Sequence, residues 1–201
     1  MGELALAVAS DAERRLRDGQ LALLPTDTVY GVAAAAELPE ACERLYRLKQ
    51  RPLDQPTAIM LGSVEGLERA LPELTGRSAE ICRQLLPGAV TLIVPNPGGR
   101  FGHLCGSTPD RIGVRVPRLD QAVAALADAV GGLTITSANE RGGPDPAQLD
   151  QVPPAIRSAA GFEVDGGVLP GVPSTVIDVT GREPRVIRGG PAAEAALAAL
   201  P

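Results

Sequence analysis

Short, continuously apolar runs of strand length recur along this chain and alternate with segments whose apolar residues repeat at helical spacing. The runs are LALLP, TAIML, VTLIVP, IGVRVP and LTITS, at 21–25, 57–61, 90–95, 112–117 and 133–137. A strand that is apolar on both faces needs cover on both faces, and helices supply that cover. The alternation therefore predicts an α/β fold with a mostly buried sheet flanked by helices.

The segments between these runs carry helix start and stop signals. Ser10-Asp11-Ala12-Glu13 fits a capping box, and Gly19 would end the helix that follows. Pro39 suits the first turn of a helix that ends near Lys49, because Pro52 disfavours a helical residue before it. The other expected helices cover 63–71, 77–86, 119–130, 147–160 and 191–200.

Two segments make the expected sheet mixed rather than purely parallel. TVIDVT at 175–180 and RVIR at 185–188 predict two strands joined by a turn at Gly181. PTDTVYGV at 25–32 combines hydroxyls, an acid and a glycine with strand formers, so we expect a strand and turn that present polar groups. No repeat or low-complexity linker interrupts the pattern, and we expect a single domain over 1–201.

Composition argues against several classes of protein. The net charge is −5, aromatic residues make up 2% of the chain, and tryptophan is absent. Tight non-specific nucleic-acid binding needs many cations, and base stacking needs aromatic side chains. No apolar run approaches the roughly 20 residues that span a bilayer, and no basic segment precedes the apolar start as in a signal peptide. We therefore expect a soluble cytoplasmic protein with no membrane contact.

The cysteines and the histidine predict no metal site. Cys42, Cys82 and Cys105 form no CxxC pair, and their odd number fits reduced, buried thiols. His103 lies near Cys105, but two such side chains do not make a metal cage.

Lys49 is the only lysine among 19 basic residues. An ammonium is a compact charge with three donors, whereas a guanidinium is a planar fork, so a single retained lysine indicates a need for a point charge. The alternative is a surface lysine at a helix C-terminus, where a cation is mildly favourable. The sequence leaves both interpretations open.

Polar residues at strand ends are the remaining candidates, since ligand sites of α/β sheets gather there. TSAN places Ser137 and Asn139 on one side of an extended segment, although Ser and Asn are more often turn or cap residues. Ser174 precedes a strand with the same ambiguity. No P-loop, GxGxxG or GxSxG motif offers another site.

Arginines in and beside strands predict an anion cavity. Arg115 lies inside an apolar strand, so it must be paired or face a ligand cavity. Arg188 ends another strand and precedes Gly189-Gly190, which permits a close backbone approach. A cavity suited to a triphosphate and a carboxylate would be lined by Lys49, Arg51, Arg111, Arg115 and Arg188.

Six segments, in order, resemble the YrdC family of threonylcarbamoyl-AMP synthases and cover nearly the whole chain. They are PTDTVYGV, LYRLKQRPLDQP, LLPGAVTLIVP, IGVRVP, TSANERGG and PSTVIDVTG…VIRGG. Lys49-x-Arg51 with Ser137-x-Asn139 matches the signature tetrad of the family, and the length matches its short bacterial form. The resemblance implies a twisted mixed sheet with a deep, positively lined cavity.

The resemblance also implies a nucleotidyltransferase reaction that serves tRNA modification. ATP, L-threonine and bicarbonate would give threonylcarbamoyl-AMP and pyrophosphate, with Mg²⁺ on the phosphates and Asp27 as the nearest acid. A separate transferase would receive the product, and weak tRNA binding is left open. The alternative is a catalytically inactive YrdC-like protein that binds nucleotide or RNA. A pure RNA-binding module and a domain of a larger maturation enzyme are further rivals.

The resemblance assigns roles by matching position. The catalytic tetrad would be Lys49, Arg51, Ser137 and Asn139. Threonine would be held by Thr28, Arg115 and Ser174. ATP would be contacted by Arg51, Gln55, Arg111, Ser137 and Arg188. Three departures from the family pattern are Met60, near the place of a threonine-contacting histidine in longer relatives, Ala89 in place of a proline, and Arg111 in place of a hydroxyl.

Overall fold

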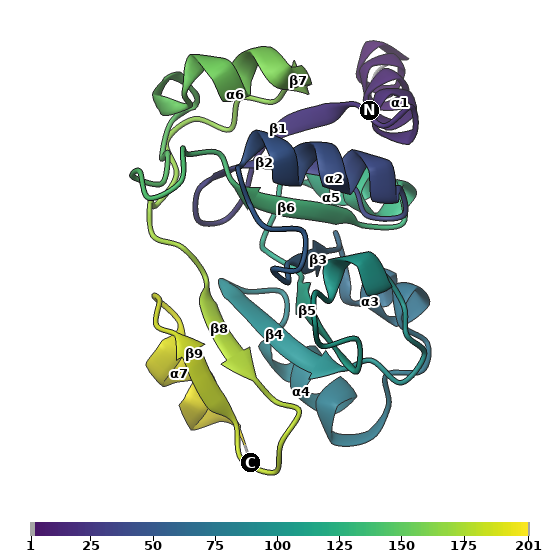
Figure 1. The fold of residues 1–201 in the computed structure, drawn as a ribbon, viewed down its shortest axis with the longest axis vertical. Helices are drawn as coiled ribbons and strands as arrows, with labels where there is room; N and C mark the ends of the chain where they lie inside the picture. The colour runs from purple at the N-terminus through teal and green to yellow at the C-terminus, as the bar shows by residue number, and fades with distance from the viewer. Residues whose placement is uncertain (1–2, 201) are drawn as a thin grey trace.

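The computed structural model describes residues 3–200, and side chains from residue 9 onward. One twisted sheet runs through the whole fold, with helices packed on it (Figure 1). The strands are β1 (Leu21–Pro25), β2 (Tyr30–Ala35), β3 (Ala58–Met60), β4 (Val90–Pro95), β5 (Arg111–Arg115), β6 (Leu133–Ser137), β7 (Ala160–Glu163), β8 (Thr175–Asp178) and β9 (Arg185–Arg188). The α-helices are α1 (Glu3–Arg17), α2 (Pro39–Leu48), α3 (Val64–Ala70), α4 (Gly76–Leu85), α5 (Gln121–Ala129), α6 (Pro154–Ala159) and α7 (Ala193–Ala199), and short 3₁₀ turns cover Gly102–Leu104 and Leu149–Gln151.

The sheet is mixed, as the sequence predicts. Its nine strands lie in the order β7-β1-β2-β6-β3-β5-β4-β8-β9. The pairs β1–β7, β3–β5 and β4–β8 are parallel, and the other neighbours are antiparallel. The predicted pair of strands at the C-terminal end is confirmed as the antiparallel pair β8–β9.

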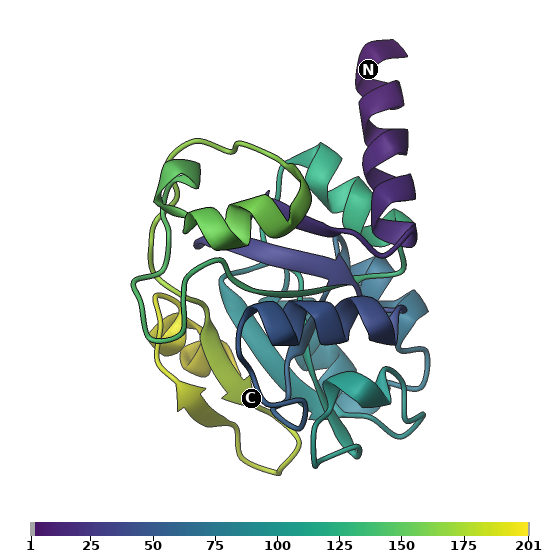
Figure 2. The same cartoon turned by 45° about the horizontal axis from the view of Figure 1, so that its top comes forward.

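Helices cover both faces of one half of the sheet but one face of the other. Around β1 and β2, one apolar cluster includes α2 and α6, and a second includes α1 and α5. Around β4, β5 and β8, a third cluster packs the sheet against α3, α4 and α7. In Figure 2, α1 stands up from the body at one end of the molecule. The opposite face of β4 and β5 has no helix in these clusters, and the site lies there.

Two local predictions are wrong, for identifiable reasons. Ser10 lies inside α1 rather than at its start, because the Ala-rich residues before it continue the helix; the Asp11 carboxylate instead pairs with Arg14 and Arg15 on the next turn. The end of this helix is as predicted, with Gly19 at φ +79°.

The segment predicted as one helix over 147–160 contains a 3₁₀ turn, the short helix α6 and the edge strand β7. β7 was missed because it has four residues and alternates between half-buried and exposed positions. Its strand conformation depends on parallel pairing with β1, which lies far away in the sequence.

Candidate active site

A cavity of about 520 Å³ opens on the face of β4 and β5 that the helices leave uncovered. Strand alternation explains which side chains reach it. Leu92 and Val114 pack into the helix-covered core, whereas their neighbours Thr91, Gly113 and Arg115 line the cavity. Every predicted site residue lines this cavity except Lys49 and Asn139.

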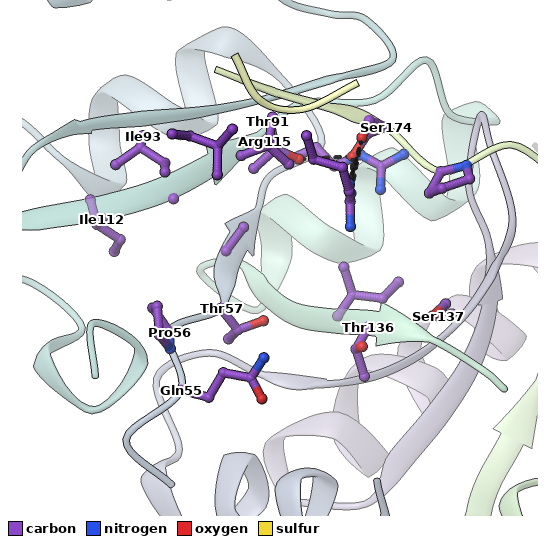
Figure 3. A pocket seen from close by; sticks show the side chains of 18 of the residues that line it. Gln55, Pro56, Thr57, Thr91, Ile93, Ile112, Arg115, Thr136, Ser137 and Ser174 are labelled. Atoms are coloured by element: carbon purple, nitrogen blue, oxygen red, sulfur yellow. Dashed lines mark hydrogen bonds between the residues drawn. The ribbon is translucent and has the colours of Figure 1, made fainter. Parts of the chain in front are cut away.

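Segments far apart in the sequence form opposite walls of the cavity. Figure 3 shows Gln55, Thr136 and Ser137 across the cavity from Arg115 and Ser174. The first wall comes from β6 and the loop after α2, and the second from β5 and the segment leading into β8. The arrangement leaves a space with polar groups at both sides.

Arg115 forms a buried ion pair at the base of the turn between β1 and β2. Its Nη2 donates to Asp27 Oδ1 at 2.6 Å and to Thr28 Oγ1 at 2.7 Å, and both charged side chains are 11% exposed. Burial lowers the pKa of Arg115, and Asp27 opposes that effect. Arg115 Nε is buried and has no hydrogen-bond partner among the described residues. The arginine is therefore both paired, by Asp27, and placed at a cavity, which are the two outcomes that its strand position predicts.

Ser174 connects β4 with the arginine at the end of β9. Its Oγ lies 3.0 Å from Thr91 Oγ1, and Arg188 Nη2 donates to Ser174 O at 2.9 Å. The predicted close backbone approach after Arg188 is present, because a Cβ on Gly190 would lie 2.6 Å from Thr175 N. These contacts fix two hydroxyls and a guanidinium on one wall of the cavity.

Lys49 is not a surface lysine, since it is 6% exposed. Its Nζ donates to the main-chain oxygen of Asn139 and, at 2.8 Å, to Asn139 Oδ1. Ser137 Oγ donates to the same Oδ1 at 2.9 Å. Burial, and then the Arg51 charge, lower the pKa of Lys49 to about 8. Lys49 and Asn139 thus lie behind Ser137 and support it, and the tetrad predicted from sequence is assembled.

Arg51 follows α2 and reaches the cavity from a tight turn. Gln50 before it adopts φ +48°. The Arg51 guanidinium lies over the Tyr46 ring, 5.5 Å from its centroid, and Nη2 donates to Pro56 O at 3.0 Å. Tyr46 Oη donates to Gln55 O at 2.9 Å, which fixes the loop that carries Gln55. Burial lowers the pKa of Arg51, and its Nε has no partner within the described chain.

The departures from the family pattern fall in different places. Arg111 lines the cavity, and its Nη1 lies 3.6 Å from Asp178 Oδ2. Met60 is fully buried in the core beside α5, and Ala58, two residues earlier on the same face of β3, lines the cavity instead. Ala89 contributes its carbonyl oxygen to a hydrogen bond from Thr175 N.

The three cysteines are buried in the protein, and the histidine contacts a main-chain oxygen. All three cysteines are free and buried, as predicted, and burial raises the pKa of Cys42 and of Cys82 to about 12. His103 Nε2 lies 2.9 Å from Ala36 O. Among the residues the structure describes, no group of three or more His, Cys, Asp and Glu side chains is placed to hold a metal ion. No helix in residues 3–200 is long and apolar enough to cross a membrane.

Sequence reasoning missed several polar residues of the cavity, among them Thr91 and Asp145. Thr91 had a usable signal, because it is the one hydroxyl residue in the apolar strand segment VTLIVP. Asp145 lies in a loop with no periodicity, so its position could be learned only from the fold.

This chain belongs to the Sua5/YciO/YrdC family, whose profile, described as telomere recombination, matches residues 14–190. A Mycobacterium tuberculosis relative, provisionally named threonylcarbamoyl-AMP synthase, is 33% identical over 180 residues, which cover 88% of this chain and 81% of the relative. The threonylcarbamoyl-AMP synthase of Bacillus subtilis is 30% identical over 186 residues, covering 90% of this chain and 53% of that protein.

Solved structures of the family share the fold. P. abyssi Sua5 complexed with L-threonine superposes with a TM-score of 0.83 and 31% identity, over 96% of this chain and 58% of that one. E. coli YciO superposes with a TM-score of 0.80 and 25% identity, over 92% of this chain and 89% of that one.

Proposed function

We propose that this chain is an L-threonylcarbamoyladenylate synthase, a nucleotidyltransferase that supplies the intermediate for threonylcarbamoyladenosine modification of tRNA. The observation that carries the proposal is one cavity in which a buried arginine and hydroxyls face Arg51 and Ser137, with Lys49 and Asn139 bonded behind Ser137. The names of the relatives support an active synthase rather than the catalytically inactive alternative.

Threonine would bind at the wall formed by Arg115, Thr28 and Ser174. A carboxylate is a suitable partner for Arg115, because its buried Nε lacks an acceptor and charge-assisted hydrogen bonds are strong. The hydroxyls of Thr28 and Ser174 lie on the same wall and can exchange hydrogen bonds with the threonine side chain. The P. abyssi relative that was solved with L-threonine supports this substrate.

ATP would bind against the opposite wall, where Arg51, Gln55 and Ser137 lie, with Arg111 and Arg188 near its phosphates. The amine of threonine and bicarbonate form a carbamate and water. A carbamate oxygen then attacks the α-phosphorus, the bond to the bridging oxygen breaks, and pyrophosphate leaves with that electron pair. Fixed cations and donors stabilise the charge that develops on the phosphoryl oxygens.

Mg²⁺ would enter with ATP as part of the substrate. The described residues offer no cluster of metal-ligating side chains, which fits an ion held mainly by phosphate oxygens and water. Its contribution would be to neutralise phosphate charge.

The partners that we propose are small molecules and a separate transferase that takes the product to tRNA. A net charge of −5 and 2% aromatic residues do not favour a primary role in RNA binding. The continuous nine-stranded sheet supports a single domain over the matched residues.

Threonine-dependent release of pyrophosphate tests the proposal. Purified protein with ATP, Mg²⁺ and bicarbonate is expected to release pyrophosphate when L-threonine is added. L-Valine, which has a methyl group in place of the hydroxyl, is expected to be at least ~100-fold less effective, because site hydroxyls would be left unpaired. Folded protein that shows no threonine dependence would favour the inactive, binding-only alternative.

A further inference from the structure

The side-chain amide of Asn139 has all of its hydrogen-bonding capacity in use. Its Oδ1 accepts from Lys49 Nζ and Ser137 Oγ. Its Nδ2 donates to Gly143 O at 2.7 Å and to Asp145 Oδ1 at 3.2 Å. An amide has two donors and two acceptor positions, so the amide group is held in one orientation.

Asp145 is the only carboxylate among the residues that line the described cavity. It is held in place by its loop, since Pro146 O accepts a hydrogen bond from Tyr30 N at 2.9 Å and Gly143 N donates to Glu140 O at 2.9 Å. Four arginines line the same cavity, yet the half-buried Asp145 forms no ion pair with a described residue, and its one side-chain hydrogen bond to a described residue comes from the Asn139 amide.

We propose that Asp145 is a positioning residue of the active site: it orients the Asn139 amide and, through it, holds the Lys49 ammonium beside Ser137. Its carboxylate can only accept from the amide nitrogen, so it directs the amide oxygen toward Lys49 and Ser137. The negative charge also polarises the amide and strengthens the oxygen as an acceptor. The contacts of Asp145 and Asn139 do not depend on the proposed function, whereas their consequence for catalysis rests on it.

The charges around Lys49 give this positioning an electrostatic effect. Arg51 on its own segment lowers the pKa of Lys49, whereas Asp145 and, less strongly, Glu140 raise it. Arg141 adds a further positive charge beside this segment, where its Nη1 donates to Gln50 O. Removing the Asp145 charge therefore lowers the Lys49 pKa further and leaves more of the amine neutral near pH 8.

The single lysine permits a direct test by NMR. Isotope-labelled lysine gives one side-chain resonance, whose titration reports the pKa of Lys49 without any turnover. Asp145→Asn keeps the size of the side chain and is expected to lower this pKa by at least roughly half a unit. Glu140→Gln is the matched control, because Glu140 is an exposed neighbour with no described hydrogen bond to Asn139, and a smaller shift is expected. Equal pKa values in wild type and Asp145→Asn, or equal shifts in both variants, would overturn the proposal.

Kinetics provide the second readout. If catalysis needs the Lys49 ammonium, activity falls as pH rises through the Lys49 pKa, so Asp145→Asn moves this alkaline limb to lower pH. We expect kcat to fall about tenfold, with a smaller change in the KM for threonine. A changed Mg²⁺ dependence with an unmoved Lys49 resonance would instead assign Asp145 to the metal and refute the positioning role. Failure of the proposed function itself would appear separately, as a wild-type protein without threonine-dependent turnover.

Discussion

Lys49→Ala is expected to reduce threonine-dependent pyrophosphate release by at least ~1000-fold, because it removes a fixed cation from the polar centre of the site. The ammonium donates to both oxygens of Asn139 and is almost fully buried, and a water molecule in its place would not supply the charge. Lys49→Arg is not expected to restore activity, because a planar guanidinium does not fit contacts made for a compact ammonium. Steady-state assays at saturating ATP and threonine measure the effect.

Arg47→Ala is the matched control for this substitution. Arg47 lies in the last turn of α2, two residues before Lys49, but it is exposed and paired with Glu43 on the preceding turn. Arg47→Ala removes one positive charge that is close to Lys49 in the sequence, from a residue that does not line the cavity. Activity is expected to stay within about twofold of wild type. Equal losses in both variants would mean that general charge, rather than the Lys49 contacts, supports the reaction.

Loss of Lys49 is not expected to unfold the protein. Burial lowers the pKa of Lys49 in the folded state to about 8, below the ordinary lysine value of 10.5. The unfolded chain therefore binds this proton more tightly, and the lysine charge opposes folding fully at pH values below about 8 and progressively less as the pH rises to 10.5. Thermal unfolding of Lys49→Ala at neutral pH distinguishes a catalytic loss from a loss of folded protein.

The second large effect is expected at Arg115. Arg115→Gln should raise the KM for threonine by on the order of 100-fold or more, because the threonine carboxylate would lose its buried cationic partner. The KM for ATP should change much less, since the proposed ATP wall lies across the cavity (Figure 3). Initial rates over a matrix of threonine and ATP concentrations separate the two constants.

Arg115→Gln also leaves Asp27 buried without its ion-pair partner, which typically costs about 3–5 kcal/mol of stability. The double variant Asp27→Asn/Arg115→Gln removes both charges and is expected to recover most of that stability. It should still bind threonine poorly. A stable double variant with a wild-type KM for threonine would remove Arg115 from the proposed threonine site.

Local patterns were sufficient to predict much of the fold and the site. The arginine inside IGVRVP had to be paired or face a cavity, and Arg115 does both. The solitary lysine indicated a special environment, and Lys49 is buried against Asn139. Ser137 and Asn139 lie together because Ser137 ends β6 and Asn139 follows it at a spacing of two residues.

Features that depend on contacts between distant segments could not be predicted in the same way. Asp27 and Arg115 are 88 residues apart, and nothing in either local sequence identifies the other as its partner. β7 is a strand because it pairs with β1, and its own four residues are a weak signal. Asp145 lies in an irregular loop, so only the folded chain brings its carboxylate to Asn139.

Incorporation of radiolabelled bicarbonate into product tests the central claim most directly. With ATP, Mg²⁺ and L-threonine, the proposed reaction predicts one bicarbonate carbon in an adenylate product for each pyrophosphate released, and no such product when threonine is omitted. Pyrophosphate release without incorporation of the label would contradict the synthase assignment, because it would indicate ATP hydrolysis or a simple amino-acid adenylate instead.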